Sequence, residues 1–522
     1  MDGVFLTTVI TCFLSLKGFY VMRDYDITPG RNNSIEILAD DSVKWSVLAE
    51  VLTRVATPIA NIVLARLLVP QAFGTVATIT MVLSLAEVIA DAGFPKYIIQ
   101  HDFCDEKELY NNANVAFWSC LWMAAFISIF IFAFRDTIAI MVGDETLGAP
   151  IAIAGLTIIF NSASSVHISF LKRNFEFKKL FIIRVVVSAI PLIITVPIAV
   201  IIRSYWAIII GNIAKAVLQA IICIVFSKIR IRLFYSLIVL KEMFSFSFWT
   251  LVESIVIWAT TNIDVFIIGR ILDEYYLGLY RTAITTITTY VGIIAASITT
   301  VLFATLSRYQ KEPERFMYTY FKFQRRLAII LIPCGVGVFV FRKLVTFILL
   351  GQNWMDVSDF LGIYALLYVF VVETCYFLSE IFRSKGQPKL SVLYQLAYIM
   401  IQTPLIYMAA LSGFKEVCVV RCILCVIFIT IALLFGRTLY GIKVLDVIKN
   451  IYVQTLGAII MGVVGMLLLH VTNRIFFQFV YIVICIIVYF SVLLCFKSIR
   501  EDVFRMLDKK RILKGNQRRG NS

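Results

Sequence analysis

The chain has 522 residues, of which 60% are hydrophobic and only 16% are charged, with a mean hydropathy of +0.90 and a formal net charge of +15. Soluble domains are only about 45–50% apolar, so this composition excludes a series of soluble domains and indicates a polytopic, all-α membrane protein. The basic residues form short clusters between apolar runs, which is typical of topology signals and lipid headgroup contacts and not of a nucleic-acid interface.

Apolar stretches long enough to cross a bilayer, about 20 residues each, recur along nearly the whole chain. Residues 1–42, an apolar segment followed by a polar linker, precede them, and we expect this part to be dispensable. The stretches cover 43–68, 75–93, 111–134, 148–171, 180–202, 205–227, 243–271, 276–306, 326–350, 358–382, 389–412, 416–436, 451–471 and 475–496. The sequence therefore predicts about fourteen transmembrane helices.

The first helical hairpin tip is repeated later in the chain. Arg66, Gly74 and Thr78 find counterparts of the same type exactly 204 positions on, at Arg270, Gly278 and Thr282. A single offset shared by several landmarks indicates an internal repeat. The repeat predicts two pseudo-symmetric six-helix bundles that enter the membrane in the same direction. A cleft between two such bundles is typical of transporters.

The repeat also gives the domain organisation. We expect a bundle at 43–227, a second bundle at 243–436, two extra helices at 451–496 and a basic tail at 497–522. Lys and Arg concentrate in the loops after even-numbered spans, and such residues stay in the cytoplasm. Both ends of the fourteen-span unit are therefore predicted to be cytoplasmic. Arg66 and Arg270 then lie near the outer mouth of the cleft, where they anchor the tips or contact headgroups.

Basic residues inside the spans are the first candidates for a substrate site, because each costs a few kcal/mol in the membrane. Glu50 and Arg54 lie one helical turn apart, so they either pair with each other or leave Arg54 free to bind a diphosphate bidentately. Lys215 has no carboxylate at helical spacing. The predicted substrate-binding residues are Arg54, Lys215, Arg281 and Arg421.

Acidic residues inside the spans are candidates for ion or proton coupling, or for structural pairing. They are Glu50, Glu87, Asp91, Glu253 and Asp264. Glu87 and Asp91 carry the same charge one helical turn apart and cannot neutralise each other. Their charge must therefore be offset by a cation, a proton or Arg54. We expect Asp264 to hold Arg281 or Arg270 as a structural clasp, or alternatively to bind substrate or an ion.

Common phosphate-binding and hydrolase motifs are missing from the sequence. It contains no G-x-x-x-x-G-K-[ST] loop, no H-E-x-x-H and no G-x-S-x-G. We therefore expect no cofactor, no metal site and no enzymatic activity. Transport would use an ion gradient, the gradient of the substrate or a partner.

Several stretches together resemble a known family. They are Leu-Ala-Arg-Leu-Leu-Val-Pro-Gln-Ala-Phe-Gly at 64–74, Ala-Gly-Phe-Pro-Lys-Tyr-Ile-Ile-Gln at 92–100, Leu-Lys-Arg-Asn-Phe-Glu-Phe at 171–177, Asn-Ile-Asp-Val-Phe-Ile-Ile-Gly at 262–269 and Leu-Gly-Leu-Tyr at 277–280. The chain is similar, over about 43–500, to the Wzx-like polysaccharide flippases of the MOP superfamily, in the branch near colanic-acid and lipopolysaccharide exporters.

This resemblance implies a substrate and a location. The substrate would be an undecaprenyl-diphosphate-linked oligosaccharide, moved across the bacterial inner membrane for O-antigen, capsule or exopolysaccharide synthesis. A polysaccharide polymerase and a chain-length regulator are the implied partners, and no nucleic acid is expected. An ion-coupled multidrug exporter with an acid-lined cleft is the alternative. A membrane glycosyltransferase or polymerase fits less well, because the predicted periplasmic loops are too short to carry catalytic groups.

Overall fold

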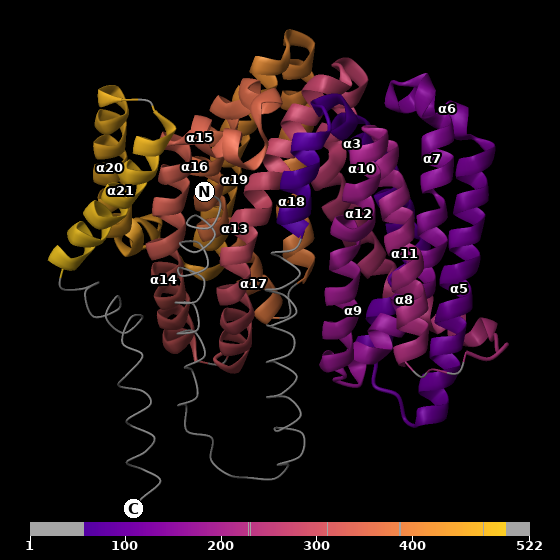
Figure 1. Cartoon of the computed structure of the whole chain (residues 1–522). Helices are drawn as coiled ribbons and strands as arrows, with labels where there is room; N and C mark the ends of the chain where they lie inside the picture. The colour runs from indigo at the N-terminus through magenta and orange to yellow at the C-terminus, as the bar shows by residue number, and fades with distance from the viewer. Residues whose placement is uncertain are drawn as a thin grey trace, which may run out of the picture.

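The fold is known from a computed structural model that describes residues 57–496, apart from 228, 230, 311, 386, 387 and 473. The described part is helical and contains no strand. Figure 1 shows the helices of the first half, indigo to magenta, on one side and those of the second half, orange to yellow, on the other. Residues 43–56 of the first predicted span lie outside the described residues.

The N-terminal bundle is built from six spans. Its helices are Thr57–Leu67, α3 (Pro70–Asp91), α4 (Phe94–Gln100), α5 (Glu106–Ala133), α6 (Arg135–Val142), η2 (Glu145–Leu147), α7 (Gly148–Ala154), α8 (Leu156–Arg173), α9 (Phe177–Ile190), η3 (Pro191–Thr195), α10 (Val196–Ile202) and α11 (Trp206–Ser227). Pro70 opens α3, a position where its missing N–H costs nothing.

The C-terminal bundle repeats this plan and is followed by a hairpin of two further helices. The bundle consists of α12 (Leu237–Ile271), α13 (Glu274–Arg308), α14 (Pro313–Val340), α15 (Arg342–Leu349), η4 (Gln352–Val357), α16 (Ser358–Val371), η5 (Val372–Tyr376), α17 (Phe377–Ser384), α18 (Pro388–Ser412) and α19 (Phe414–Tyr440). The hairpin consists of α20 (Val444–Val471) and α21 (Ile475–Cys495), and α20 packs on α14.

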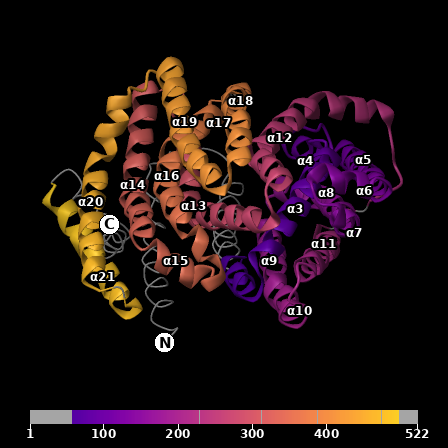
Figure 2. The ribbon, with the colours of Figure 1, turned by 90° about the horizontal axis from the view of Figure 1, so that it is seen from above.

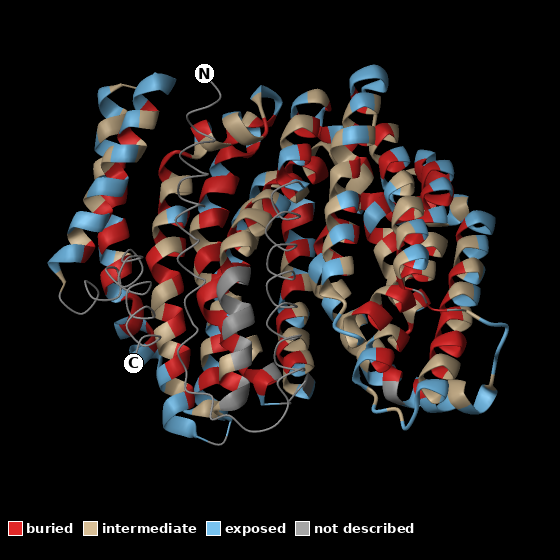
Figure 3. Cartoon of the chain, turned by 60° about the horizontal axis from the view of Figure 1, so that its bottom comes forward, coloured by how far each residue is buried: buried red, intermediate tan, exposed pale blue. Residues whose placement is uncertain are grey.

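The prediction of about fourteen spans is approximately confirmed. Twelve helices in the described part of the chain are long and apolar enough to cross a membrane. The shorter apolar helix Thr57–Leu67 and the 35-residue α13 complete the predicted set. Large apolar side chains such as Trp122, Phe126 and Ile201 are exposed. Figure 3 shows exposed positions on outer helix faces and buried positions between helices, the pattern expected for helices in lipid.

The two bundles meet chiefly through one pair of helices, α3 and α13, whose packing is the most extensive between the bundles. Figure 2 shows α3 beside α12 and α13 at the centre of the molecule. Apolar residues of both halves, such as Ile79 and Ile284, belong to a single buried core cluster. This central contact positions the polar groups described next.

Candidate functional site

The two repeated hairpin tips lie directly against each other. A Cβ atom added to Gly74 would overlap the carbonyl group of Glu274, with only 2.8 Å to its carbonyl carbon. A Cβ atom added to Gly278 would overlap the carbonyl group of Pro70 in the same way, with 2.7 Å to its carbonyl carbon. Each repeat thus inserts its glycine against the backbone of the other. Only glycine allows two helices to approach this closely.

Two arginines connect the bundles beside these glycines. Arg66 Nη2 donates a hydrogen bond of 2.7 Å to the carbonyl oxygen of Ile348, near the C-terminal end of α15. Arg270 Nη1 donates to the carbonyl oxygens of Ile140, at 3.1 Å, and Met141, at 2.8 Å, near the C-terminal end of α6. Each arginine therefore caps a short helix of the opposite bundle, where the helix dipole favours a cation. The structure shows these arginines anchoring the tips.

Glycines with left-handed backbone make room for both arginines. Gly143 follows α6 with φ of 98°, and Gly351 follows α15 with φ of 101°. A Cβ atom on Gly143 would lie 3.0 Å from Cα of Arg270, and one on Gly351 would lie 3.4 Å from Cγ of Arg66. We refer to Arg66, Gly74, Arg270 and Gly278 and their contacts as the tip interface. Its two halves are related by the internal repeat.

Away from the tips, the bundles are joined by weaker polar contacts. Lys96 on α4 lies 3.9 Å from the Glu253 carboxylate on α12 and 3.4 Å from the Ser254 hydroxyl. Both charged side chains are partly exposed, and exposed ion pairs contribute about 0–1 kcal/mol. Nearer the centre, Trp258 Nε1 donates to the Ser84 hydroxyl at 2.9 Å. Glu253, a predicted coupling or pairing residue, thus lies between the bundles.

The N-terminal bundle brings three predicted site residues together, Glu87, Asp91 and Lys215. Asn161 Nδ2 donates to the Glu87 carboxylate at 2.6 Å, and the charge of Glu87 also acts on Lys215 from α11. The Ser165 hydroxyl lies near Asp91 and donates to the Ser162 carbonyl at 3.0 Å. Lys215 is exposed halfway along its span, and the carboxylate whose charge acts on it comes from another helix, which helical spacing alone could not reveal. We call this group the Glu87 cluster.

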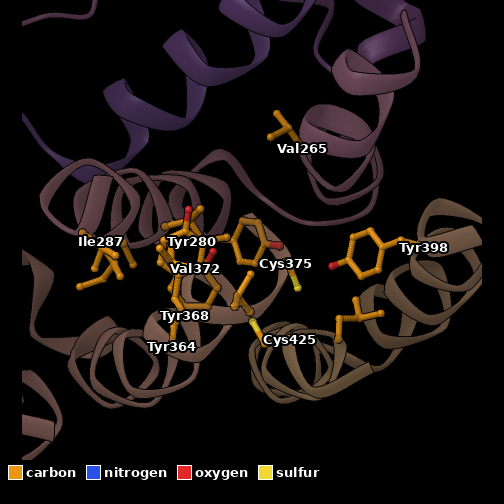
Figure 4. Packing of buried hydrophobic residues seen from close by; sticks show 14 of the residues in the cluster. Val265, Tyr280, Ile287, Tyr364, Tyr368, Val372, Cys375, Tyr398 and Cys425 are labelled. Carbon is orange, nitrogen blue, oxygen red and sulfur yellow. The ribbon is translucent and has the colours of Figure 1, made fainter. Parts of the chain in front are cut away.

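The C-terminal bundle contains a second cluster, formed by Asp264, Tyr280 and Arg421. The Tyr280 hydroxyl donates to Asp264 at 2.8 Å, and Arg421 Nη1 lies 3.8 Å from the same carboxylate oxygen. The guanidinium group also lies over the ring of Tyr364. Figure 4 shows Tyr280 and Tyr364 close together, with the Tyr398 hydroxyl pointing toward this group. Asp264 is only 1% exposed, so its charge depends on these partners.

The prediction that Asp264 holds Arg281 or Arg270 is wrong. Arg281 instead donates to the backbone carbonyl of Thr261 at 3.2 Å, and Arg270 belongs to the tip interface. Successive residues of a helix point about 100° apart. Tyr280 faces the buried side of α13 and reaches Asp264, whereas its neighbour Arg281 points elsewhere.

The structure does not test the predictions for two further site residues. Glu50 and Arg54 lie outside the described residues, so their proposed pairing or cleft position stays a prediction. In the part of the chain that the structure covers, no group of three His, Cys, Asp or Glu side chains could hold a metal ion.

One buried acid was missed by the sequence reasoning. Glu373 lies in the π-helical turn η5 and is fully buried, and neither of its carboxylate oxygens has a hydrogen-bond partner among the described residues. An acid within a predicted span is itself a signal for a functional residue, so its position in 358–382 could have identified it.

Comparison with known proteins gives one family and several relatives. The sequence model of the family described as "Polysaccharide biosynthesis protein" matches residues 63–359. A Klebsiella pneumoniae "Uncharacterized membrane protein in cps region" is 22% identical over 384 residues, covering 72% of this chain and 78% of that protein. The Escherichia coli "Lipopolysaccharide biosynthesis protein WzxC" is 22% identical over 320 residues, covering 60% of this chain and 63% of that protein.

A third relative is the "Succinoglycan biosynthesis transport protein ExoT" of Rhizobium meliloti, with 22% identity over 325 residues, 62% of this chain and 65% of that protein. Among solved structures, the lipid II flippase MurJ in an inward closed conformation matches with a TM-score of 0.68 and 16% identity, covering 90% of this chain and 99% of that chain. An outward-facing multidrug MATE transporter of the MOP superfamily matches with a TM-score of 0.52 and 13% identity, covering 79% and 99%. The fold is thus that of MOP-superfamily transporters.

Proposed function

The chain belongs to the polysaccharide biosynthesis protein family, and from that premise we propose that it translocates a lipid-linked oligosaccharide across the bacterial inner membrane. The substrate is an undecaprenyl-diphosphate-linked repeat unit, which moves from the cytoplasmic to the periplasmic leaflet by alternating access. The observation that carries this proposal is the tip interface, in which two pseudo-symmetric bundles close against each other through equivalent contacts.

The tip interface has the properties of a gate between two states. It consists of close backbone contacts and a few hydrogen bonds, each contributing only about 0.5–1.5 kcal/mol, or up to about 3 kcal/mol with a charged donor. Two conformations that interconvert differ by a few kcal/mol. Rocking of the bundles would separate both halves of the interface together, because the repeat relates them, and would open the periplasmic side.

Basic residues within the spans would bind the diphosphate. We assign this role to Arg54, Lys215 and Arg281. Lys215 is exposed at mid-span, and its link to Glu87 is electrostatic, so a diphosphate could replace that carboxylate as its partner. Arg421 is engaged by Asp264 and three tyrosines, so we assign it to positioning of the C-terminal bundle.

The protein would act as a transporter and not as an enzyme. Both ends of its fourteen-span unit would lie in the cytoplasm. Translocated repeat units would then pass to a polymerase and a chain-length regulator at the outer leaflet. The multidrug-exporter alternative needs acidic groups that are free to bind a cation. Asp264 accepts a hydrogen bond from Tyr280 and lies beside Arg421, and Glu87 accepts one from Asn161, so the protein's own donors disfavour that alternative.

Gene deletion tests the proposal. We expect the lipid-linked saccharide to accumulate in the cytoplasmic leaflet, protected from a membrane-impermeant sugar-oxidising reagent added to spheroplasts. The wild-type gene should restore export, and Lys215→Ala should not, at unchanged protein level. Lys415→Ala, which removes an exposed cation elsewhere, is the matched control. Normal outer-leaflet saccharide in the deletion strain would contradict the proposal.

A further inference from the structure

Glu373 is an acid without a counter-charge in the interior of the C-terminal bundle. Its side chain is fully buried, and both carboxylate oxygens lack a hydrogen-bond partner among the described residues. It lies in η5, the π-helical turn between α16 and α17. Such turns interrupt regular helix geometry and occur frequently at functional sites.

The neighbouring polar groups are engaged elsewhere. Gln324 Nε2 of α14 donates to the backbone carbonyl of Glu373 at 3.0 Å and not to its carboxylate. Arg325 Nε donates to Asn450 at 3.0 Å. Arg421 of α19 lies beside Asp264. No ion pair with Glu373 occurs in the described part of the chain.

Among the described residues, the charge of Glu373 acts on two tyrosines. They are Tyr320 of α14 and Tyr489 of α21, and both are neutral phenols at physiological pH. The Tyr489 hydroxyl donates to the Ile329 carbonyl at 2.9 Å, so its proton is already used. No described group therefore supplies positive charge to Glu373.

An ionised carboxylate in this environment is strongly disfavoured. Moving an unpaired charge out of water costs at least several kcal/mol in a protein, far more than burying a neutral acid. Asp264 shows the contrast, because a tyrosine hydroxyl and an arginine offset its charge. Glu373 can be buried in this way only as the neutral carboxylic acid.

A small cavity lies beside the turn that carries Glu373. A cavity with room for about one water molecule is lined by Tyr320 and Thr374, next to Glu373 in sequence. Its other walls include Gly436, Ile442 and Val447, at the turn between α19 and α20. This turn lies on the side predicted to be cytoplasmic. Water in the cavity could reach Tyr320, which lies near enough to Glu373 for the charge of a carboxylate there to act on it.

We propose that Glu373 is a proton-binding site filled from the cytoplasmic side. A hydronium ion in the cavity water donates a proton to one carboxylate oxygen. One of its O–H bonds breaks, a carboxyl O–H bond forms, and a water molecule and a neutral acid remain. The site is occupied in the closed-tip conformation and is emptied when rearrangement brings Glu373 to water or to a cation. Use of this proton to drive translocation rests on the proposed function, but proton binding itself does not.

Carbodiimide labelling tests the site directly. Dicyclohexylcarbodiimide modifies protonated carboxyl groups in apolar surroundings, and peptide mass spectrometry locates the adduct on the purified full chain. We expect an adduct on Glu373 at about neutral pH that declines as the pH rises, and none on the exposed Glu416. Glu373→Gln should lose the adduct. An unmodified Glu373 throughout the range from about pH 6 to about pH 9 would overturn the proposal.

A stability measurement provides a second readout. If the folded state binds a proton that the unfolded state releases, stability falls as pH rises. The wild-type melting temperature should fall with pH, and that decline should be reduced in Glu373→Gln, which mimics the neutral acid. Identical pH profiles for both proteins would also overturn the proposal. Both readouts are independent of substrate, so a negative translocation assay with positive labelling would refute only the proposed function.

Discussion

A side chain added at the tip interface should prevent the two tips, which we predict to face the periplasm, from closing. In Gly278→Val, Cβ would lie within 2.7 Å of the Pro70 carbonyl carbon and 3.0 Å of the Gly74 nitrogen, whereas ordinary contacts are 3.4–4 Å. Both neighbours are backbone atoms, which cannot rotate away. The tips must therefore separate, and Gly74→Val should act in the same way from the other bundle.

The size of the effect follows from the cost of overpacking. Extra methyl groups in a tightly packed contact cost typically about 1–3 kcal/mol. A free-energy difference of about 1–3 kcal/mol shifts an equilibrium between closed and open tips by about 5- to 150-fold. Gly337→Val in α14 is the matched control, because a Cβ atom on Gly337 would meet nothing within 4 Å.

Thiol labelling can measure this opening. Thr282 lies one helical turn beyond Gly278 and is 9% exposed, so Thr282→Cys should react slowly with a membrane-impermeant maleimide added from the periplasmic side. Mass spectrometry of the peptide containing residue 282 separates this signal from native cysteines. Gly278→Val should speed labelling by the factor given above, and Gly337→Val should not. Equal rates in all three proteins would refute the tip interface as a gate.

Three further predictions concern the charged groups. Arg66→Ala and Arg270→Ala should each accelerate labelling at Thr282→Cys by a similar factor, because the repeat makes their hydrogen bonds equivalent, whereas Lys415→Ala should have no effect. Burial and the neighbouring Asp144 raise the pKa of Glu274 to about 7, so closure of the tips should be favoured below that pH and weaken as the pH rises through it. The rate of maleimide labelling at Thr282→Cys should therefore rise with pH. A rate that does not depend on pH would contradict this role of Glu274 in closure. Asp264→Ala should lower the free energy of unfolding by about 3–5 kcal/mol, because the largely buried Arg421 loses its counter-charge. Asp264→Ala combined with Arg421→Leu should recover much of this loss in a thermal melt, and an unrecovered double variant would contradict the pairing.

The architecture could be predicted because it depends on local and periodic properties. Span length follows from bilayer thickness, and the shared offset of Gly74 and Gly278 revealed both the repeat and the surfaces that meet. The contacts themselves could not be predicted in the same way. Arg66 binds a backbone carbonyl on α15, and a carbonyl acceptor has no signature in the side-chain sequence.

The polar clusters show a second limit of sequence spacing. Helical periodicity compares residues on one helix or one hairpin, so it suggested Arg281 and Arg270 for Asp264. The observed partner, Arg421, comes from a helix far along the chain. The carboxylate whose charge acts on Lys215, that of Glu87, likewise comes from another helix, α3. The burial of Glu373 without a hydrogen-bond partner for its carboxylate also depends on tertiary packing, which sequence spacing does not show.

Under the proposed function, we expect lipid-linked oligosaccharide to cross the membrane only when the tip interface opens. Arg270→Cys and Met141→Cys would place two exposed cysteines across this interface, where a short bis-maleimide can join them. The measurement is translocation of lipid-linked saccharide, extracted from the deletion strain, in proteoliposomes. Cross-linked protein should stop translocating, while each single variant, treated identically, should continue. Undiminished translocation by the cross-linked protein would contradict this expectation.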